Sequence, residues 1–300
     1  MSASDRSQAQ LPEPVEGEGL PARAHIGIGS VVGGYRLLRP LGAGEHGAVF
    51  LAAAADGWVA LKLVPLPPDR AHPARAAFLH GAEVARGLVH PGIVGLAAAG
   101  IEGEVGWLAL EPVPGGDLLR YTRASRLLPV PVVLRLGERV AQALAYAHER
   151  GVVHRDIKPA NVLVDWATDL VKVADFGLAR STTSPRTETG VVLGSPAYMA
   201  PELLAGEAPT PASDLYALGA MLFQLLSASL PHEGATMGEL LRRVAQSAAP
   251  DLASLRPELP PRLSALVAAM LAKRTAERPA QARQIAQDLA ALRAAMADPA

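Results

Sequence analysis

Short apolar runs, separated by glycine, proline and acidic residues, dominate the first part of the chain. Such runs are typical of β-strands, which are brief and rich in branched or aromatic side chains. The pattern predicts strands at residues 35–41, 48–53, 58–64, 93–100 and 105–112. Asp56-Gly57 is a hairpin signal between two of these runs. One helical pattern interrupts the strands, at residues 73–87.

From Leu118 onward the apolar residues recur at the helical period instead. This pattern predicts helices at residues 131–150, 213–229, 237–245, 262–272 and 280–296. Pro114-Gly115-Gly116 marks the change from one pattern to the other. The predicted fold class is therefore α+β, with a small antiparallel β-sheet lobe that carries one helix and a larger, mainly helical lobe.

Composition narrows the class of protein. The 300 residues carry a net charge of −1 and contain no cysteine. General nucleic-acid binding requires a basic surface, so we expect no nucleic-acid partner. A chain without cysteine has neither a disulfide nor a thiolate metal site, which suits a cytoplasmic protein.

The ends of the chain and one internal apolar segment bear on tails and membranes. Residues 1–34 are polar and rich in proline and glycine, which predicts a disordered N-terminal tail, and residues 293–300 are expected to form a C-terminal tail. Residues 215–230 are the most membrane-like stretch, but they are short for a membrane span and include Gln224. We interpret them as a buried core helix and expect no membrane partner.

A glycine-rich segment with the spacing GxGxxGxV occupies residues 41–49. Glycine allows backbone N–H groups to approach phosphate oxygens closely. Dinucleotide-binding folds share the GxGxxG spacing, but there it leads into a helix, whereas here it leads into a predicted strand. The next strand holds Lys62 among apolar residues, where an ammonium group is costly without an anionic partner. A surface position at a strand edge is the alternative for Lys62.

The segment His154-Arg155-Asp156-Ile157-Lys158-Pro159-Ala160-Asn161, with Asp175-Phe176-Gly177 after it, carries the chemistry. Phosphoryl transfer from ATP needs one carboxylate to accept a hydroxyl proton, and an amide plus a second carboxylate to hold Mg²⁺. Here the chain resembles the Hanks-type (eukaryotic-like) serine/threonine protein kinases of bacteria. The resemblance extends from about Tyr35 to Leu292. It implies the bilobal protein kinase fold, with a nucleotide-binding small lobe at 35–113 and a catalytic large lobe at 114–292.

The resemblance assigns a role to each matching residue. Asp156 would deprotonate the attacking hydroxyl, Lys158 would neutralise charge on the transferred phosphoryl group, and Lys62 would pair with the α- and β-phosphates. Asn161 and Asp175 would hold Mg²⁺, or Mn²⁺ in its place. The residues expected to bind ATP are Leu41, Gly42, Ala43, Gly44, Glu45, His46, Gly47, Ala48, Val49, Ala60, Lys62, Glu111, Val113, Asp117, Asn161 and Asp175.

Residues 107–117 match the connection between the two lobes. Backbone groups of Glu111 and Val113 would bind the adenine edge, Leu110 would control access behind it, and Asp117 could reach the ribose. A plain interlobe linker is the alternative for this segment.

One expected partner is missing. Kinases hold the strand lysine with a glutamate on the small-lobe helix, but the matching position here is Gly81. Glu83 lies two residues further on, about 200° around the helix, so it would face away unless the helix is rotated or slipped. Either Glu83 reaches Lys62 in that way, or it is a solvated helix charge and the ion pair is absent. The absence favours a pseudokinase or a nucleotide-gated signalling scaffold as the alternative to an active enzyme.

The hydroxyl-rich segment between Asp175 and Glu202 suggests regulation. Thr187 and Thr189 match positions at which related kinases phosphorylate themselves, and Arg155 could pair with a phosphothreonine. An ordinary flexible loop is the alternative, because loops are often rich in hydroxyl groups.

The resemblance also implies partners and internal anchors. Residues 194–199 resemble the substrate-binding stretch of serine/threonine kinases, which favours protein substrates over small molecules. Self-association would allow phosphorylation between copies of the chain. Glu202 is expected to form a buried pair with Arg278, and Asp214 to anchor the catalytic loop.

Overall fold

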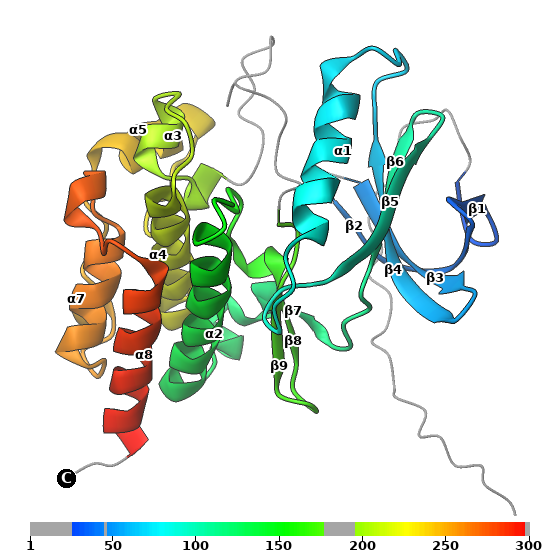
Figure 1. Cartoon of the computed structure of the whole chain (residues 1–300). Helices are drawn as coiled ribbons and strands as arrows, with labels where there is room; N and C mark the ends of the chain where they lie inside the picture. Colours follow the sequence, from blue (N-terminus) through cyan, green and yellow to red (C-terminus); the bar gives the residue numbers. More distant parts are fainter. Residues whose placement is uncertain (1–25, 45–46, 177–195, 298–300) are drawn as a thin grey trace, which may run out of the picture.

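The computed structural model describes residues 26–44, 47–176 and 196–297, and these form two lobes (Figure 1). The small lobe contains a six-stranded antiparallel sheet with the strand order β1-β2-β3-β4-β6-β5. Its elements are β1 (Val31–Val32), β2 (Tyr35–Gly44), β3 (Gly47–Ala54), β4 (Gly57–Pro65), α1 (Pro73–Arg86), β5 (Leu96–Glu102) and β6 (Val105–Leu110). A single helix therefore accompanies the small sheet in the described residues, as the apolar pattern predicts.

The large lobe is mainly helical. A small antiparallel sheet, β7-β8-β9, lies where it meets the small lobe (Figure 1). Its strands and α-helices are β7 (Gly116–Asp117), α2 (Val130–His148), β8 (Val162–Asp165), β9 (Leu170–Val173), α3 (Pro201–Leu204), α4 (Pro211–Ser227), α5 (Met237–Gln246), α6 (Leu252–Leu255), α7 (Pro261–Met270) and α8 (Ala282–Ala297). The short 3₁₀ helices are η1 (Leu118–Tyr121), η2 (Ala124–Arg126), η3 (Pro159–Asn161), η4 (Pro196–Tyr198) and η5 (Thr275–Glu277). The two lobes of the protein kinase fold are confirmed.

Strand β4 shows how alternation builds the small lobe. Leu61 and Leu63 are buried in a cluster with Phe50 on one face of the sheet. Ala60 and Val64 pack instead with the apolar cluster that includes residues of α1. Side chains alternate between the faces of a strand, so Lys62 shares the face of Ala60. The alternation directs the ammonium group away from the Leu61 cluster.

The large lobe is organised around α4, which runs through its centre (Figure 1). Leu215, Leu218 and Leu222 have no exposed surface. This confirms that residues 215–230 contribute a buried core helix. No helix in the described part of the chain combines the length and apolar character needed to cross a membrane.

The ordered region differs from the prediction at both ends. Residues 26–34 were expected to belong to a disordered tail, but Val31 and Val32 pair with Arg36 and Tyr35. Helix α8 ends at Ala297, one residue past the predicted helix end at 296, so residues 293–297 are helical although they were expected to belong to the C-terminal tail. Short pairings of this kind depend on the rest of the sheet, so a composition rich in glycine hides them.

Candidate active site

The catalytic loop brings three predicted residues together. The Asn161 side-chain nitrogen donates to the main-chain oxygen of Asp156 at 2.7 Å and to its Oδ2 at 3.0 Å. Lys158 Nζ lies 2.8 Å from the same Oδ2. The Asp156 carboxylate is therefore held by one amide and one cation, with a quarter of its side-chain surface exposed (25%).

Asp214, near the start of α4, holds the backbone of this loop. Its carboxylate accepts hydrogen bonds from the backbone N–H groups of His154 and Arg155, each at 2.8 Å. It also lies 2.8 Å from His148 Nε2. Arg155 has a φ of 74°, a left-handed conformation that costs energy in a residue other than glycine. The two bonds to Asp214 stabilise that conformation, which confirms the predicted anchoring role.

The metal-binding candidates lie on adjacent segments. Ala174 donates its backbone N–H to the carbonyl oxygen of Asn161 at 2.8 Å, which places Asp175 beside the catalytic loop. His154 Nε2 contacts the carbonyl oxygen of Ala174, also at 2.8 Å, and its ring meets Phe176 edge-on. The residue before Asp175 is thus bonded on both sides.

The donor set at this point fits Mg²⁺. Asp175 offers a carboxylate, and Asn161 uses its amide nitrogen toward Asp156, so its carbonyl oxygen is the end suited to a cation. Mg²⁺ is usually held by one or two protein oxygens together with substrate phosphates. The described residues contain no group of three or more histidine or acidic side chains arranged for a metal.

Lys62 lies on β4 with 9% of its surface exposed, which excludes the strand-edge surface position. Its ammonium group contacts Asp175 Oδ2 at 2.6 Å. The anionic partner that a buried ammonium requires is therefore Asp175, the aspartate that the resemblance assigns to Mg²⁺.

Of the two alternatives for Glu83, the structure shows the exposed helix charge, and Lys62 pairs with Asp175 instead. Gly81 lies on the buried face of α1 with Ala82 and Ala85, whereas Glu83 is exposed. Among the described residues no ion pair involves Glu83. The reason is the helical geometry, because residues two positions apart point to nearly opposite sides.

The glycine-rich segment forms the β2–β3 hairpin and leads into a strand, as predicted. Gly44 pairs with Gly47 across the turn, while Glu45 and His46 lie outside the described residues. Gly47 has a φ of 118°, and a Cβ there would lie 1.8 Å from the carbonyl oxygen of Leu63. Glycine is therefore required at 47 by close contact with β4, in addition to any contact with phosphate.

The segment between the lobes engages the side chain of Glu111 in an unforeseen contact. Its Oε2 lies 2.8 Å from Lys172 Nζ and accepts the backbone N–H of Gly95 at 3.1 Å. The Glu111 N–H donates to the Gly95 carbonyl at 2.8 Å, and its own carbonyl stays the group predicted to bind adenine. Sequence reasoning missed Lys172, although the same signal that identified Lys62, a lysine between apolar strand residues, was present in Val171-Lys172-Val173.

The other ATP-binding candidates lie on strands of the small lobe and on the segment between the lobes. Leu41 is 41% exposed, and Ala60 packs with the α1-side cluster together with Val113. Asp117 caps η1 by accepting the Leu119 N–H at 2.9 Å, and burial raises the pKa of its carboxyl group. Its contact with ribose stays a prediction.

Residues 177–195 lie outside the described residues, and Thr187, Thr189, Gly194 and Ser195 are among them. Arg278 donates to both Glu202 oxygens, at 2.7 and 2.8 Å, which confirms that predicted buried pair. Burial is the largest single influence on the pKa of Glu202 and raises it. The hydrogen bonds and charge of Arg278, a backbone hydrogen bond and the hydrogen bond from Ser213 together outweigh burial, so the pKa is lowered overall.

Comparisons with known proteins agree with this geometry. Residues 35–289 match the protein kinase domain family. PknJ of Mycobacterium tuberculosis, a serine/threonine-protein kinase, is 44% identical over 213 residues, covering 69% of this chain and 36% of the relative. PrkC of Bacillus subtilis, also a serine/threonine-protein kinase, is 34% identical over 233 residues, covering 77% of this chain and 36% of the relative.

The crystal structure of the Mycobacterium tuberculosis PknI kinase domain superposes with a TM-score of 0.70 at 32% identity, covering 89% of this chain and 99% of that one. The chain thus spans about a third of the length of the full-length relatives PknJ and PrkC. It belongs to the protein kinase family, as a domain of the Hanks serine/threonine type.

Proposed function

We propose that this chain is a serine/threonine protein kinase that transfers the γ-phosphoryl group of ATP to hydroxyl groups of proteins. The observation that carries the proposal is the Asp156 carboxylate, held by Asn161 at 3.0 Å and by Lys158 at 2.8 Å. A carboxylate fixed in this way orients a hydroxyl group and accepts its proton as the oxygen attacks. Lys158, on the same oxygen, neutralises the charge that develops on the transferred group.

Asn161 and Asp175 would hold Mg²⁺, which supplies charge neutralisation on the phosphate oxygens when bound. Lys62 would bind phosphate through its ammonium group. Lys62 and Asp175 contact each other at 2.6 Å. The pair keeps each charge compensated.

The direct test is phosphate incorporation into a generic protein substrate and into the chain itself, with Mg²⁺ and γ-labelled ATP. The wild type should incorporate label, and Asp156→Asn should reduce the rate by about 10²–10⁴-fold, because the proton acceptor is lost. Glu258→Gln is the matched control, since it makes the same chemical change at a side chain that is 60% exposed. Nucleotide binding by the wild type without any incorporation would overturn the enzyme assignment.

Self-phosphorylation at Thr187 or Thr189 is part of this proposal. It is supported by the place of these threonines between Asp175 and Glu202 and by the neighbouring Arg155. Mass spectrometry of wild type incubated with ATP should find phosphate on one of them. Asp156→Asn protein should acquire it when mixed with active wild type, which would show transfer between copies. Phosphate confined to other residues would remove these two sites from the proposal.

A nucleotide-gated scaffold is the second candidate. It is favoured by one specific observation, the buried glycine at position 81 where the family places the glutamate partner of Lys62. In that case ADP should bind and change the conformation, while the labelling experiment stays negative. The complete set of Asp156, Asn161 and Asp175 favours the enzyme.

A further inference from the structure

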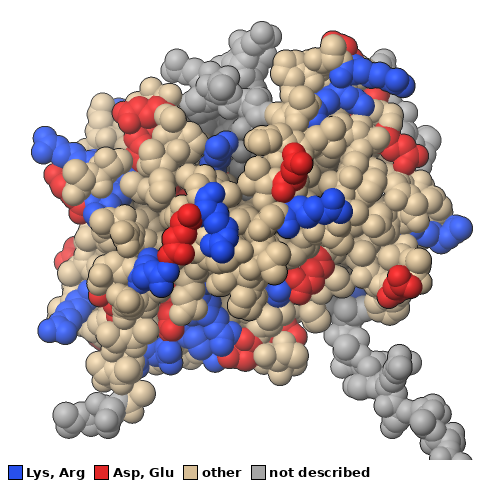
Figure 2. Space-filling view, viewed as in Figure 1, with Lys and Arg blue, Asp and Glu red and all other residues tan. Residues whose placement is uncertain are grey.

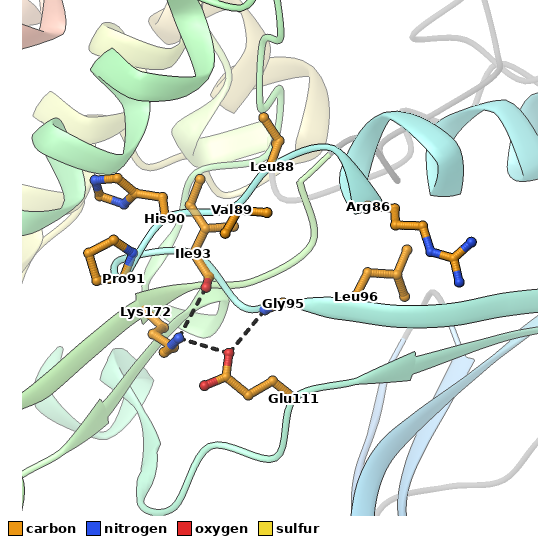
Figure 3. A pocket seen from close by; sticks show the side chains of 10 residues that line it. All are labelled: Arg86, Leu88, Val89, His90, Pro91, Ile93, Gly95, Leu96, Glu111 and Lys172. Carbon is orange, nitrogen blue, oxygen red and sulfur yellow. Dashed lines mark hydrogen bonds and ion pairs between the residues drawn. The ribbon is translucent and has the colours of Figure 1, made fainter.

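Lys172 is a buried cation at the junction of three segments (Figure 3). It lies on β9 with 8% of its surface exposed. Its ammonium group donates to Glu111 Oε2 at 2.8 Å and to the carbonyl oxygen of Ile93 at 3.3 Å. One side chain thus joins the strand that precedes Asp175, the interlobe segment and the loop that follows α1.

Glu111 completes the junction from the other side. Its Oε2 accepts the backbone N–H of Gly95 at 3.1 Å in addition to the Lys172 ammonium group. Its own backbone N–H donates to the Gly95 carbonyl at 2.8 Å. Both the main chain and the side chain of this residue are therefore fixed, which determines where its remaining backbone carbonyl points.

A pocket of about 350 Å³ opens above this junction, and both Lys172 and Glu111 line it (Figure 3). Water can reach the Glu111 side chain, which is 41% exposed, whereas that of Lys172 is 10% exposed. Lys172 therefore depends more on the ion pair than Glu111 does, because little water can reach its ammonium group if the partner is lost.

Backbone hydrogen bonds fix the residues between Lys172 and Asp175. Val173 is bonded on both sides of its backbone, donating to the Gly92 carbonyl at 2.8 Å and accepting from Val94 at 2.9 Å. Ala174 donates to Asn161 at 2.8 Å. With every intervening residue hydrogen-bonded, a displacement of Lys172 displaces Asp175 as well.

We propose that Lys172 and Glu111 form a positioning pair that sets the distance between the adenine-binding carbonyl of Glu111 and the metal-binding carboxylate of Asp175. Neither side chain touches the reacting atoms. The pair instead makes base binding and metal binding cooperative, because the Glu111 carbonyl and the Asp175 carboxylate belong to one rigid unit. This inference rests on the proposed binding of Mg²⁺ and a nucleotide at the site.

The measurement that isolates this role is the affinity for ADP with and without Mg²⁺, by titration calorimetry. In the wild type Mg²⁺ should tighten ADP binding. In Lys172→Met that enhancement should fall by about tenfold, within the usual range of coupling between sites, while ADP alone is affected less. A merely structural loss would weaken both affinities together and leave their ratio unchanged.

A control variant and a double-mutant cycle of Lys172 and Glu111 accompany this measurement. Arg293→Met breaks the ion pair with Glu138 in the large lobe, 2.9 Å long, and should leave the ratio as in wild type. Glu111→Gln should reproduce the effect of Lys172→Met, and the double variant should be no worse than either one, because the two residues act as a unit.

The positioning role would be overturned if folded Lys172→Met kept the wild-type ratio of ADP affinities with and without Mg²⁺. Additive losses in the double variant would overturn it as well. If Lys172→Met does not fold, Glu111→Gln carries the test by itself, since its side chain is partly exposed. Wild type that binds no ADP would overturn both proposals, whereas wild type that couples Mg²⁺ and ADP but transfers no phosphate would overturn the enzyme assignment alone.

Discussion

At the scale of single residues, two buried lysines lie at the candidate site, and each is neutralised by a carboxylate from a distant part of the chain. Lys62 contacts Asp175 at 2.6 Å and Lys172 contacts Glu111 at 2.8 Å. An unpaired ammonium group in these positions would cost several kcal/mol. The two strands therefore keep their lysines only because carboxylates reach them from other segments.

The partner of Lys62 leads to a prediction about activity. Lys62→Met should reduce phosphoryl transfer by about 10²–10³-fold, the usual loss when one electrostatic contact to the transition state is removed. Glu83→Ala should retain wild-type rates, because Glu83 is exposed and no ion pair in the described residues involves it. Initial rates of label incorporation would check both. A loss in Glu83→Ala comparable to that in Lys62→Met would show that α1 turns to bring Glu83 inward during catalysis.

The residue types at the site could be predicted from the sequence, but their partners could not. The spacing from Asp156 to Asn161 and the isolated charge of Lys62 carry a chemical requirement that is visible locally. The contact between Lys62 and Asp175 depends on how two lobes meet, and no local pattern encodes it. Lys172 shows the same local pattern as Lys62, a lysine between apolar strand residues, but no catalytic motif includes it, so it was missed.

At the scale of elements, α4 connects core packing to the catalytic loop. The same helix buries Leu215, Leu218 and Leu222 in the large lobe and presents Asp214 to the backbone of His154 and Arg155. A residue fixed by packing on a buried helix is a more rigid support than one on a loop.

Asp214→Asn should separate this support from the chemistry. The amide is of similar size but has one acceptor oxygen instead of two, so one backbone N–H loses its partner, at a cost of about 1–3 kcal/mol. We expect a lower midpoint in urea unfolding and a loss of activity of about tenfold or more, since the left-handed Arg155 is no longer held. Wild-type activity in a folded Asp214→Asn protein would contradict the anchoring role.

Element boundaries show where local patterns fail. The apolar run at 93–100 predicts one strand, but β5 starts at Leu96. Ile93 and Val94 pair instead with Val173 of β9 in the large lobe. Tertiary contacts divide the run between two lobes, and hydrophobicity alone does not reveal the division.

At the scale of the whole molecule, the lobes are joined on the side of the α1–β5 loop by several short-range contacts. The ring of His90 stacks on that of Tyr146 with centroids 4.9 Å apart, and Val89 donates its N–H to the Tyr146 hydroxyl at 3.1 Å. Over the face shown in Figure 2, acidic and basic side chains lie interspersed among uncharged ones. The net charge of −1 therefore reflects a mixture of both signs.

The stability of the large lobe should depend on pH through His232. This side chain is 4% exposed, and its Nε2 lies 2.9 Å from Lys273 Nζ. Burial, followed by the charges of Lys273 and Arg243, lowers the pKa of His232 to about 4. The unfolded chain, with the ordinary value near 6.5, then binds a proton more readily than the folded one. Folding stability should therefore decrease as the pH falls from about 6.5 toward about 4.

Between about pH 7 and about pH 5 this group alone should remove about 2 kcal/mol from the free energy of unfolding. His232→Phe removes the titration and keeps a ring at this buried position. The free energy of unfolding of this variant should therefore fall by about 2 kcal/mol less than that of the wild type over the same range, as measured by urea unfolding at each pH. All other titrating groups are shared by the two proteins, and their difference isolates His232. Parallel losses in wild type and His232→Phe would contradict a neutral, buried His232, because a histidine with an ordinary pKa contributes nothing to the difference.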